Sequence, residues 1–208
     1  MDVHPPHEPI HSWRDFFLHL ATITVGLLIA LGLEAAVESL HHRHVVEVAR
    51  ENIHKEIERN HHAATGNLTN VDANKKSMQT DIEQLRILRK DPTTKGLSTS
   101  YAFTWSSFNE SAWLSARDSG ALTYMPIDEV QRYADLYNQQ EIVTSQAITI
   151  FASEIEVAAP FMTEPDGTLT HDQIQGVIQG TAITFSRLYA LQQIIVQLDH
   201  SYVEILKQ

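Results

Sequence analysis

The chain has 208 residues, no cysteine and a formal net charge of −11 when its histidines are neutral. The absence of cysteine excludes disulfides and thiol chemistry, and the acidic balance argues against binding to nucleic acid or to anionic lipid. This length corresponds to one or two domains. Protonation of all twelve histidines would move the formal charge to about +1, within the pH range in which histidine titrates.

Residues 1–11 contain three of the seven prolines and three histidines. A segment of this composition buries little apolar surface, so we expect a disordered or extended tail. Ser12 follows the tail, and Asp15 stands three residues later, at the spacing of a capping box. This pair predicts that a helix begins here.

An apolar run from Phe16 to Leu33 (FFLHLATITVGLLIALGL) comes next, with His19 as its one ionisable side chain. A helix through these eighteen residues is roughly 27 Å long, at about 1.5 Å per residue, which is close to the hydrocarbon thickness of a bilayer. Trp13 and Arg14 precede the run, as interface anchors do. The sequence therefore predicts one transmembrane helix over residues 12–37.

Three other interpretations of this run stay open. A cleaved signal peptide has a basic start, a shorter apolar core and a small-x-small cleavage site. Here one arginine and three acidic residues precede the run. A buried helix of a soluble domain is compatible with Thr22 and Thr24, although eighteen residues is long for one. An interfacial helix has a polar face, which this run lacks.

Two features inside the run are candidates for a functional role. Thr22, Gly26 and Ala30 repeat at four-residue spacing, and such a stripe of small residues lets two transmembrane helices approach closely. Ordinary use of glycine and alanine in a span explains the pattern equally well. His19 is placed to ligate a porphyrin, to pair with a polar group, or to stay at the headgroup level.

Residues 38–90 are predicted to form a helical stalk, with no proline and with one glycine, Gly66. Its apolar residues recur at spacings of three, four and seven, which is typical of a coiled-coil-like seam that needs a partner helix. Asn60 and Lys75 are polar exceptions on the seam, and a break or kink is expected at Gly66 and Asn67. The seam consists of Val46, Ala49, Ile53, Ile57, Ala64, Leu68, Val71, Met78, Ile82 and Leu85.

Asp91 and Pro92 end the stalk, and residues 91–106 are predicted to be a linker rich in serine and threonine. Residues 107–208 are predicted to form a helical bundle region that packs on the distal stalk. Ser107 and Glu110 have capping-box spacing, so we expect a short helix to begin there and to end near Gly120.

Two long helices are predicted to follow. Pro126 begins the first and Pro160 ends it. Residues 164–167 are expected to form a tight turn, after which Thr170 and Gln173 cap the second helix. The first helix is predicted to place these residues on one side: Val130, Tyr133, Ala134, Tyr137, Ile148, Phe151, Ile155 and Ala158.

The fold class predicted is all-α, because no stretch alternates convincingly with a period of two. An N-terminal transmembrane helix continues into the coiled-coil-like stalk. The distal stalk packs with one short helix and with the two long helices, which are antiparallel because the turn between them is short.

The residues with most chemical potential are histidines three positions after a glutamate. The predicted stalk contains three such pairs: Glu38/His41, Glu51/His54 and Glu58/His61. At this spacing both side chains lie on one helix face and could share Zn²⁺ or Fe²⁺, as in di-iron carboxylate bundles. A solvated, histidine-rich surface is the simpler interpretation, and no bound cofactor is expected.

No enzymatic motif is found. Glycine-rich phosphate loops, a nucleophile elbow and paired cysteines are all absent from the sequence, so we predict a protein that is not an enzyme. Trp105, Trp113 and Tyr124 surround the predicted short helix, either as a binding patch or as core filling.

Two blocks resemble a family of uncharacterised bacterial single-span membrane proteins. In the first, an aromatic residue precedes the apolar run Val25-Gly26-Leu27-Leu28-Ile29-Ala30-Leu31 and a long charged helix follows. The second runs from Ala112-Trp113-Leu114 through Ser119-Gly120-Ala121-Leu122 to Tyr137. The span here ends Leu33-Glu34-Ala35-Ala36, where the family has a segment like Asn-Trp-Asn-Glu. The resemblance implies a membrane-anchored helical protein with no known activity.

Together these features predict a membrane-anchored, non-enzymatic interaction or scaffold protein. Its expected partners are the lipid bilayer and either copies of itself or the subunits of a larger bacterial inner-membrane assembly. The alternative is a metal-binding or pH-responsive protein that uses histidine and carboxylate. Arg43 and Arg50 after the span favour a cytoplasmic bundle over Arg14 before it, but only by one charge. Acidic domains translocate readily and the family's tails are more basic, so we expect a periplasmic bundle.

Overall fold

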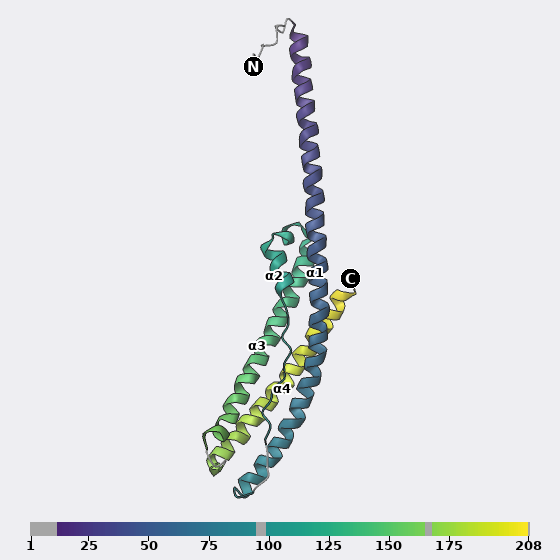
Figure 1. Cartoon of the computed structure of the whole chain (residues 1–208). Coiled ribbons are helices and arrows are strands. Elements are labelled where there is room, and N and C mark those ends of the chain that lie inside the picture. The colour runs from purple at the N-terminus through teal and green to yellow at the C-terminus, as the bar shows by residue number, and fades with distance from the viewer. Residues whose placement is uncertain (1–11, 95–98, 165–167, 208) are drawn as a thin grey trace, which may run out of the picture. The chain divides into compact units, whose positions relative to one another are not determined.

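The computed structural model describes residues 12–94, 99–164 and 168–207. Its long helices are α1 (Trp13–Lys90), α3 (Ile127–Thr163) and α4 (His171–Leu206) (Figure 1). A short helix, α2 (Ser111–Asp118), and a 3-10 helix, η1 (Ala121–Tyr124), lie between α1 and α3 in the chain. These described residues contain no strand, which confirms the all-α class. The predicted tail, residues 1–11, lies outside them.

The chain divides into two units, Met1–Val48 and Ala49–Gln208. In the described part of the first unit, every residue from Trp13 to His41 is exposed. Ser12 caps the start of α1 by accepting a hydrogen bond of 3.1 Å from the backbone N–H of Arg14. The apolar run within this part of α1 is long and apolar enough to cross a membrane, and none of it is buried against other described residues.

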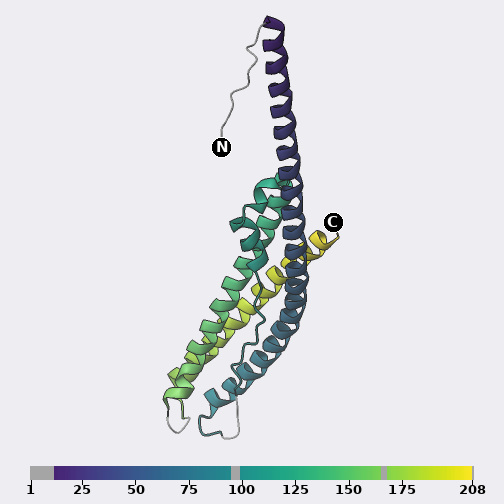
Figure 2. The same cartoon turned by 45° about the horizontal axis from the view of Figure 1, so that its top comes forward.

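The second unit is a bundle of three long helical segments: the remainder of α1, α3 and α4. α3 and α4 run antiparallel to each other beside α1, as predicted (Figures 1 and 2). Leu85 of α1, Val157 of α3 and Val177 of α4 belong to one buried cluster, so all three helices contribute to the core.

The face that α1 buries in this unit contains part of the predicted seam, although Leu68 and Ile82 are only half-buried and Ala49 is 8% exposed. Six seam residues have at most 2% of their surface exposed. They are Ile53, Ile57, Ala64, Val71, Met78 and Leu85. α1 continues through Gly66 and Asn67, so the expected break there is wrong. Asn67 is fully buried and hydrogen-bonded to another part of the chain, which holds the helix in place at this point.

A second column of residues on α1, also seven positions apart, is polar. It consists of Asn60, Asn67, Asn74 and Asp81, and it holds the extended segment 99–110 against the helix. Asn60 donates from Nδ2 to the carbonyl of Asn109 at 2.7 Å and accepts its N–H on Oδ1 at 2.8 Å.

The next positions of the column repeat this pattern. Asn67 makes the same two bonds with Ser106, both at 2.8 Å, and Asp81 accepts the N–H of Ser100 at 3.2 Å. The backbone of the extended segment thus finds in the side chains of α1 the partners that a neighbouring strand would supply.

The repeat of this polar column follows from simple geometry. Seven residues of helix advance about 10.5 Å, and three residues of extended chain advance about 10 Å. Each heptad of α1 therefore meets every third residue of the segment. The same step would place Asn74 opposite Phe103, but Nδ2 of Asn74 is buried without a hydrogen-bond partner among the described residues.

Glu56, one turn before this column and fully buried, orders the start of α2. Its carboxylate accepts hydrogen bonds from the N–H of Ala112 at 2.9 Å and of Trp113 at 3.3 Å. It also accepts hydrogen bonds from the hydroxyl groups of Ser111 at 2.9 Å and Tyr137 at 2.8 Å. The first N–H groups of a helix have no partner within the helix, and here a carboxylate from α1 supplies one.

This arrangement explains why the predicted start of the short helix is wrong. α2 begins at Ser111, with Glu110 as its N-cap and no side-chain cap bond, so the proposed capping box of Ser107 and Glu110 does not form. The end of the helix is as predicted, because Gly120 adopts the left-handed conformation with φ of 77°.

The ends of the two long helices match the predictions in part. Pro126 is the N-cap of α3, and Thr170 and Gln173 form the predicted capping box of α4. Pro160, however, lies inside α3, which continues to Thr163. A proline this close to the end removes only one backbone hydrogen bond before the helix would stop anyway. Most of the predicted turn, residues 165–167, lies outside the described residues.

Candidate functional site

An uncharged apolar stripe runs along the exposed side of α3. Ile148, Phe151, Ile155 and Met162 are 63%, 53%, 54% and 83% exposed. Their spacings of three, four and seven place them on one face of the helix. The opposite face of α3 is also apolar and is buried in the bundle, where it includes Val143, Ala147, Ile150 and Val157. α3 therefore presents apolar residues in two directions.

This stripe corrects one prediction about α3. The residues predicted to share one side divide between two faces: Tyr133 and Tyr137 are buried, whereas Ile148, Phe151 and Ile155 are exposed. The buried face of α3 continues past position 140 through Val143, Ala147 and Ile150, so the exposed residues belong to a second apolar face of the same helix.

Phe103 and Trp105 of the extended segment border the stripe. Their rings stack with centroids 5.9 Å apart and planes 15° apart. Together with Ala147, Ile148 and Phe151 they line an apolar groove of about 280 Å³. Such a concave apolar surface beside an exposed helix face is suited to binding an apolar side chain of a partner.

The polar column of α1 positions these two aromatic residues. It holds the backbone at Ser100 and Ser106, on either side of them. Side chains two apart on an extended chain point to the same side, so Phe103 and Trp105 turn toward α3 together. The sequence predicts only a linker at residues 91–106, not an extended segment that packs on α1. The signal was present, because Tyr101, Phe103 and Trp105 alternate with smaller residues at a period of two.

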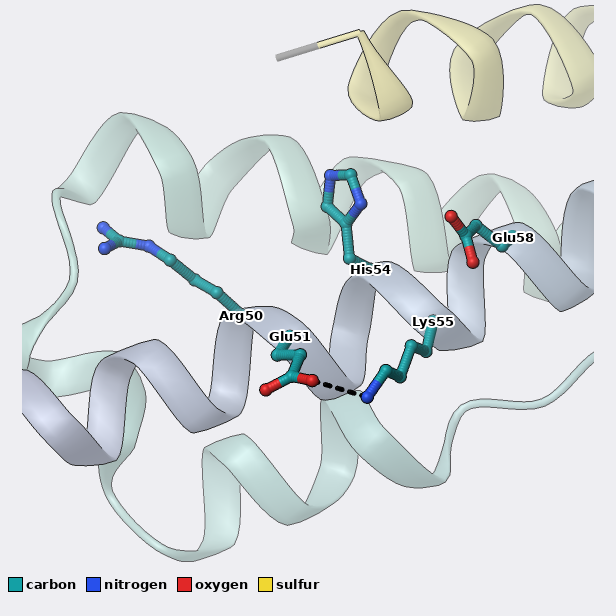
Figure 3. Close-up of a pocket in the computed structure, with 5 residues that line it drawn as sticks. All are labelled: Arg50, Glu51, His54, Lys55 and Glu58. Atoms are coloured by element: carbon teal, nitrogen blue, oxygen red, sulfur yellow. Dashed lines mark hydrogen bonds and ion pairs between the residues drawn. The ribbon is translucent and has the colours of Figure 1, made fainter.

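Of the predicted Glu-x-x-His pairs, Glu51/His54 lies on a shallow, open surface pocket of the second unit, together with Glu58 (Figure 3). The Glu51 carboxylate turns to Lys55 at 2.5 Å, and His54 points away from it. The hydrogen bond from Lys55 lowers the pKa of Glu51. The fifth residue of the pocket, Arg50, binds a different partner.

That partner is Glu129 of α3, which Arg50 binds through two hydrogen bonds of 2.6 Å. The Arg50 guanidinium holds the pKa of the Glu129 carboxyl below its usual range. A planar, two-point pair of this kind fixes the orientation of both side chains. It therefore ties α1 to α3 beside the pocket.

The other two pairs also meet different partners. Oε1 of Glu38 lies 3.8 Å from Nε2 of His42 rather than beside His41. Nδ1 of His61 lies 2.8 Å from Oδ1 of Asp199 on α4. Among the residues that the structure describes, no group of three or more possible metal ligands gathers. Binding of Zn²⁺ or Fe²⁺ by these pairs stays a prediction.

The small-residue stripe of the apolar run is uncovered by the described chain. Thr22, Gly26 and Ala30 are all exposed, and a Cβ added at Gly26 would meet nothing within 4 Å. The Thr22 hydroxyl donates to the carbonyl of Leu18 at 2.9 Å, so its polar group is satisfied within the helix. Nδ1 of His19 lies 3.1 Å from the carbonyl of Asp15. Contact of this stripe with another helix stays a prediction.

The aromatic residues around α2 belong to separate groups. Trp113 stacks on Tyr137 with centroids 5.4 Å apart, on the side of α2 that faces α3. Trp105 contacts Phe103 and Phe108 instead, and Tyr124 is exposed.

The described residues thus offer two surfaces for recognition, the exposed apolar run of α1 and the stripe of α3 with its groove. Comparison of the chain with known protein families, with curated proteins and with solved structures finds no match.

Proposed function

We propose that this chain is a membrane-anchored, non-enzymatic interaction protein that serves as an accessory or scaffold subunit of a bacterial inner-membrane assembly. The observation that carries the proposal is the exposure of the apolar run. Its large apolar side chains are between 42% and 69% exposed over residues 16–33. Burying one such side chain contributes about 1.5–3 kcal/mol, so a helix with many of them needs an apolar surrounding. A bilayer provides it along the whole run.

The interaction surface in this proposal is the α3 stripe, and its occupant is a second copy of the chain. Ile148, Ile155 and Met162 repeat every seven residues, and Ala152 and Ala159 leave room between them. Large side chains of one copy fit over the alanines of the other, as in a two-helix seam. The stripe carries no charge, so no like charges face each other at the contact, although each chain has a net charge of −11. A surface that complements itself is what a two-fold dimer requires.

The anchor is tested by fractionation of a bacterial host that produces the full chain. We expect the chain to stay with the membrane after an alkaline carbonate wash. Replacing both Leu27 and Leu28 by Lys places two charges at the centre of the run, at a cost of about 2.5–3.5 kcal/mol each, and should release the chain. The control, Leu40→Lys, changes an exposed residue beyond the proposed span of residues 12–37 and should leave the chain bound.

Two results would contradict the anchor. One is a wild-type chain that the carbonate wash releases. The other is a mature chain whose N-terminus, determined by sequencing, begins after the run, as it would after cleavage of a signal peptide.

A further inference from the structure

A pocket of about 440 Å³ lies in the second unit, where the last turn of α4 meets the first turns of α3 and the neighbouring part of α1. Its volume is in the range of natural small-molecule sites, about 300–1,000 Å³. It shares no residue with the α3 stripe or with the groove beside that stripe. Its lining residues, in chain order, are Arg50, His54, Glu129, Arg132, Tyr133 and Ile205.

The charges in this pocket favour an anion. Its one carboxylate among the described lining residues is Glu129, which Arg50 binds through two hydrogen bonds of 2.6 Å. These two charges neutralise each other, and the positive charge of Arg132 remains in excess. Arginine stays protonated at any physiological pH. Glu58 lies on the shallow outer pocket and not in this one.

Two polar side chains in the pocket are available to a ligand. The structure shows no hydrogen bond or ion pair from Arg132 or His54 to the residues that it describes. The planar guanidinium of an arginine matches the two oxygens of a carboxylate, and a neutral imidazole supplies one further N–H. His54 points to the side on which α4 ends (Figure 3).

The rest of the pocket wall is apolar. Tyr133 and Ile205 are 7% and 9% exposed, so both are held firmly in the bundle. The ring of Trp113 packs on that of Tyr133, with centroids 6.3 Å apart. A site that combines an apolar wall with a few convergent polar groups is typical of small-molecule recognition.

We propose that this pocket binds a small organic carboxylate. Its carboxyl group pairs with Arg132 and His54, and its apolar part lies against Tyr133 and Ile205. A single excess positive charge matches a carboxylate better than a phosphate monoester, which carries about −1.5 to −2 charges near neutral pH. The site uses no residue of the anchor or of the α3 stripe, so its test is independent of the proposed function.

The test is fluorine NMR of para-fluorobenzoate added to the full chain in mild detergent at about pH 7, with detergent alone as the blank. We expect saturable broadening of the probe signal by the wild type. Arg132→Gln removes a charge-assisted pair and should weaken binding at least about tenfold. The control Arg59→Gln removes the same charge from an exposed position of α1 outside the pocket and should bind as the wild type does.

Two further measurements guard against a trivial loss of binding. Arg132 is exposed, so we expect the urea unfolding midpoint of Arg132→Gln without ligand to equal that of the wild type. His54→Ala removes the second donor and should also weaken binding of the probe, which tests the site through a different helix.

Competition identifies the chemistry of the ligand. Benzoate should displace the probe, whereas acetate, which lacks the apolar part, should need at least about tenfold more. Inorganic phosphate should displace the probe no better than acetate, and para-fluorobenzylamine, a cation of similar size, should not bind. No saturable binding by the wild type, equal binding by Arg132→Gln, binding of the amine as tight as that of the carboxylate, or displacement by phosphate at lower concentration than by benzoate would each overturn the proposal.

Discussion

At the scale of single residues, asparagine side chains of the second unit make the hydrogen bonds to an extended segment that the backbone of a neighbouring strand would normally make. The amides of Asn60 and Asn67 each pair with both the N–H and the carbonyl of one residue in the extended segment. An extended segment without a neighbouring strand leaves such groups without partners, and a buried unpaired group costs about 1–3 kcal/mol. Two asparagines on α1 therefore replace a strand.

This leads to a prediction for Asn67→Ala. The change removes two half-buried hydrogen bonds to the backbone of Ser106, each with a net contribution of about 0.5–1.5 kcal/mol, so we expect the free energy of unfolding to fall by about 1–3 kcal/mol. Urea unfolding in mild detergent measures it. Asn52→Ala, at an exposed position of the same helix, should change stability by no more than about 0.5 kcal/mol. Equal effects of the two variants would show that the pairing is not important.

The sequence allowed only half of this feature to be predicted. Asn60 is recognisable from the sequence as a polar exception on the seam. The seven-residue column through Asn67, Asn74 and Asp81 is not, because the backbone groups that it binds belong to a segment far along the chain. A buried asparagine signals that some partner exists, not which one. The alternation of Tyr101, Phe103 and Trp105 was the available clue to that partner.

The histidines give a second prediction at this scale. Because Glu51 binds Lys55 and His61 lies beside Asp199, we expect the purified full chain to hold no stoichiometric Zn²⁺ or Fe²⁺ at neutral pH. Metal analysis after dialysis against trace Zn²⁺ checks this. About one metal ion per chain, lost in a His54→Ala, His61→Ala double variant and lost on mild acidification, would establish the metal-binding alternative instead.

At the scale of helices, α4 has two glycines in different surroundings. A Cβ at Gly180 would lie 2.6 Å from Cγ2 of Val157 on α3, whereas a Cβ at Gly176 would meet nothing within 4 Å. The absence of a side chain at Gly180 thus allows α3 and α4 to approach closely. At Gly176 the glycine only weakens the helix.

The two glycines form a matched pair of tests. Gly180→Ala should lower the free energy of unfolding by about 1–3 kcal/mol, because α3 and α4 must move apart or Val157 must change rotamer. Gly176→Ala should raise it by up to about 1 kcal/mol through helix propensity. Thermal unfolding of both variants in one detergent measures the difference. Shifts in Tm of the same sign would contradict this account of the α3–α4 contact.

Helix ends were predictable where the signal is local. Thr170 and Gln173 cap α4 with atoms three residues apart, so the sequence contains both partners. The start of α2 was not predictable, because Glu56 on α1 supplies its acceptor. For α3 the difficulty was different. Apolar residues lie on both its buried and its exposed faces, and a pattern of hydrophobicity does not distinguish a core from a binding surface.

At the scale of the whole molecule, the orientation of the proposed anchor in the membrane is open to a direct test. We expect the second unit on the periplasmic side. Protease added to intact spheroplasts should then remove the C-terminal region, detected with a C-terminal tag, while a cytoplasmic marker protein stays intact. Full protection of the tag until the membrane is lysed would place this unit in the cytoplasm, as Arg43 and Arg50 favour by the positive-inside rule.

Self-association is the remaining prediction at this scale. The contact between two copies could lie on the α3 stripe or on the small-residue stripe of the apolar run, and separate variants test each surface. If the α3 stripe joins two copies, Ile155→Lys places a charge in the middle of the stripe and should weaken the dimer at least about tenfold, or about 1.4 kcal/mol. Gln146→Lys adds the same charge at an exposed position of α3 away from the stripe and should leave the dimer intact.

Gly26→Leu tests the stripe of Thr22, Gly26 and Ala30 separately. Small residues allow two transmembrane helices to approach closely, and a leucine side chain at Gly26 would hold them apart. Mass measurement in mild detergent over a range of chain concentrations gives the oligomeric state of each variant. A loss of the dimer with Gly26→Leu alone would place the contact in the membrane. A wild type that is monomeric at every concentration would contradict both proposed contacts. The α3 stripe would then bind a partner other than a second copy of this chain.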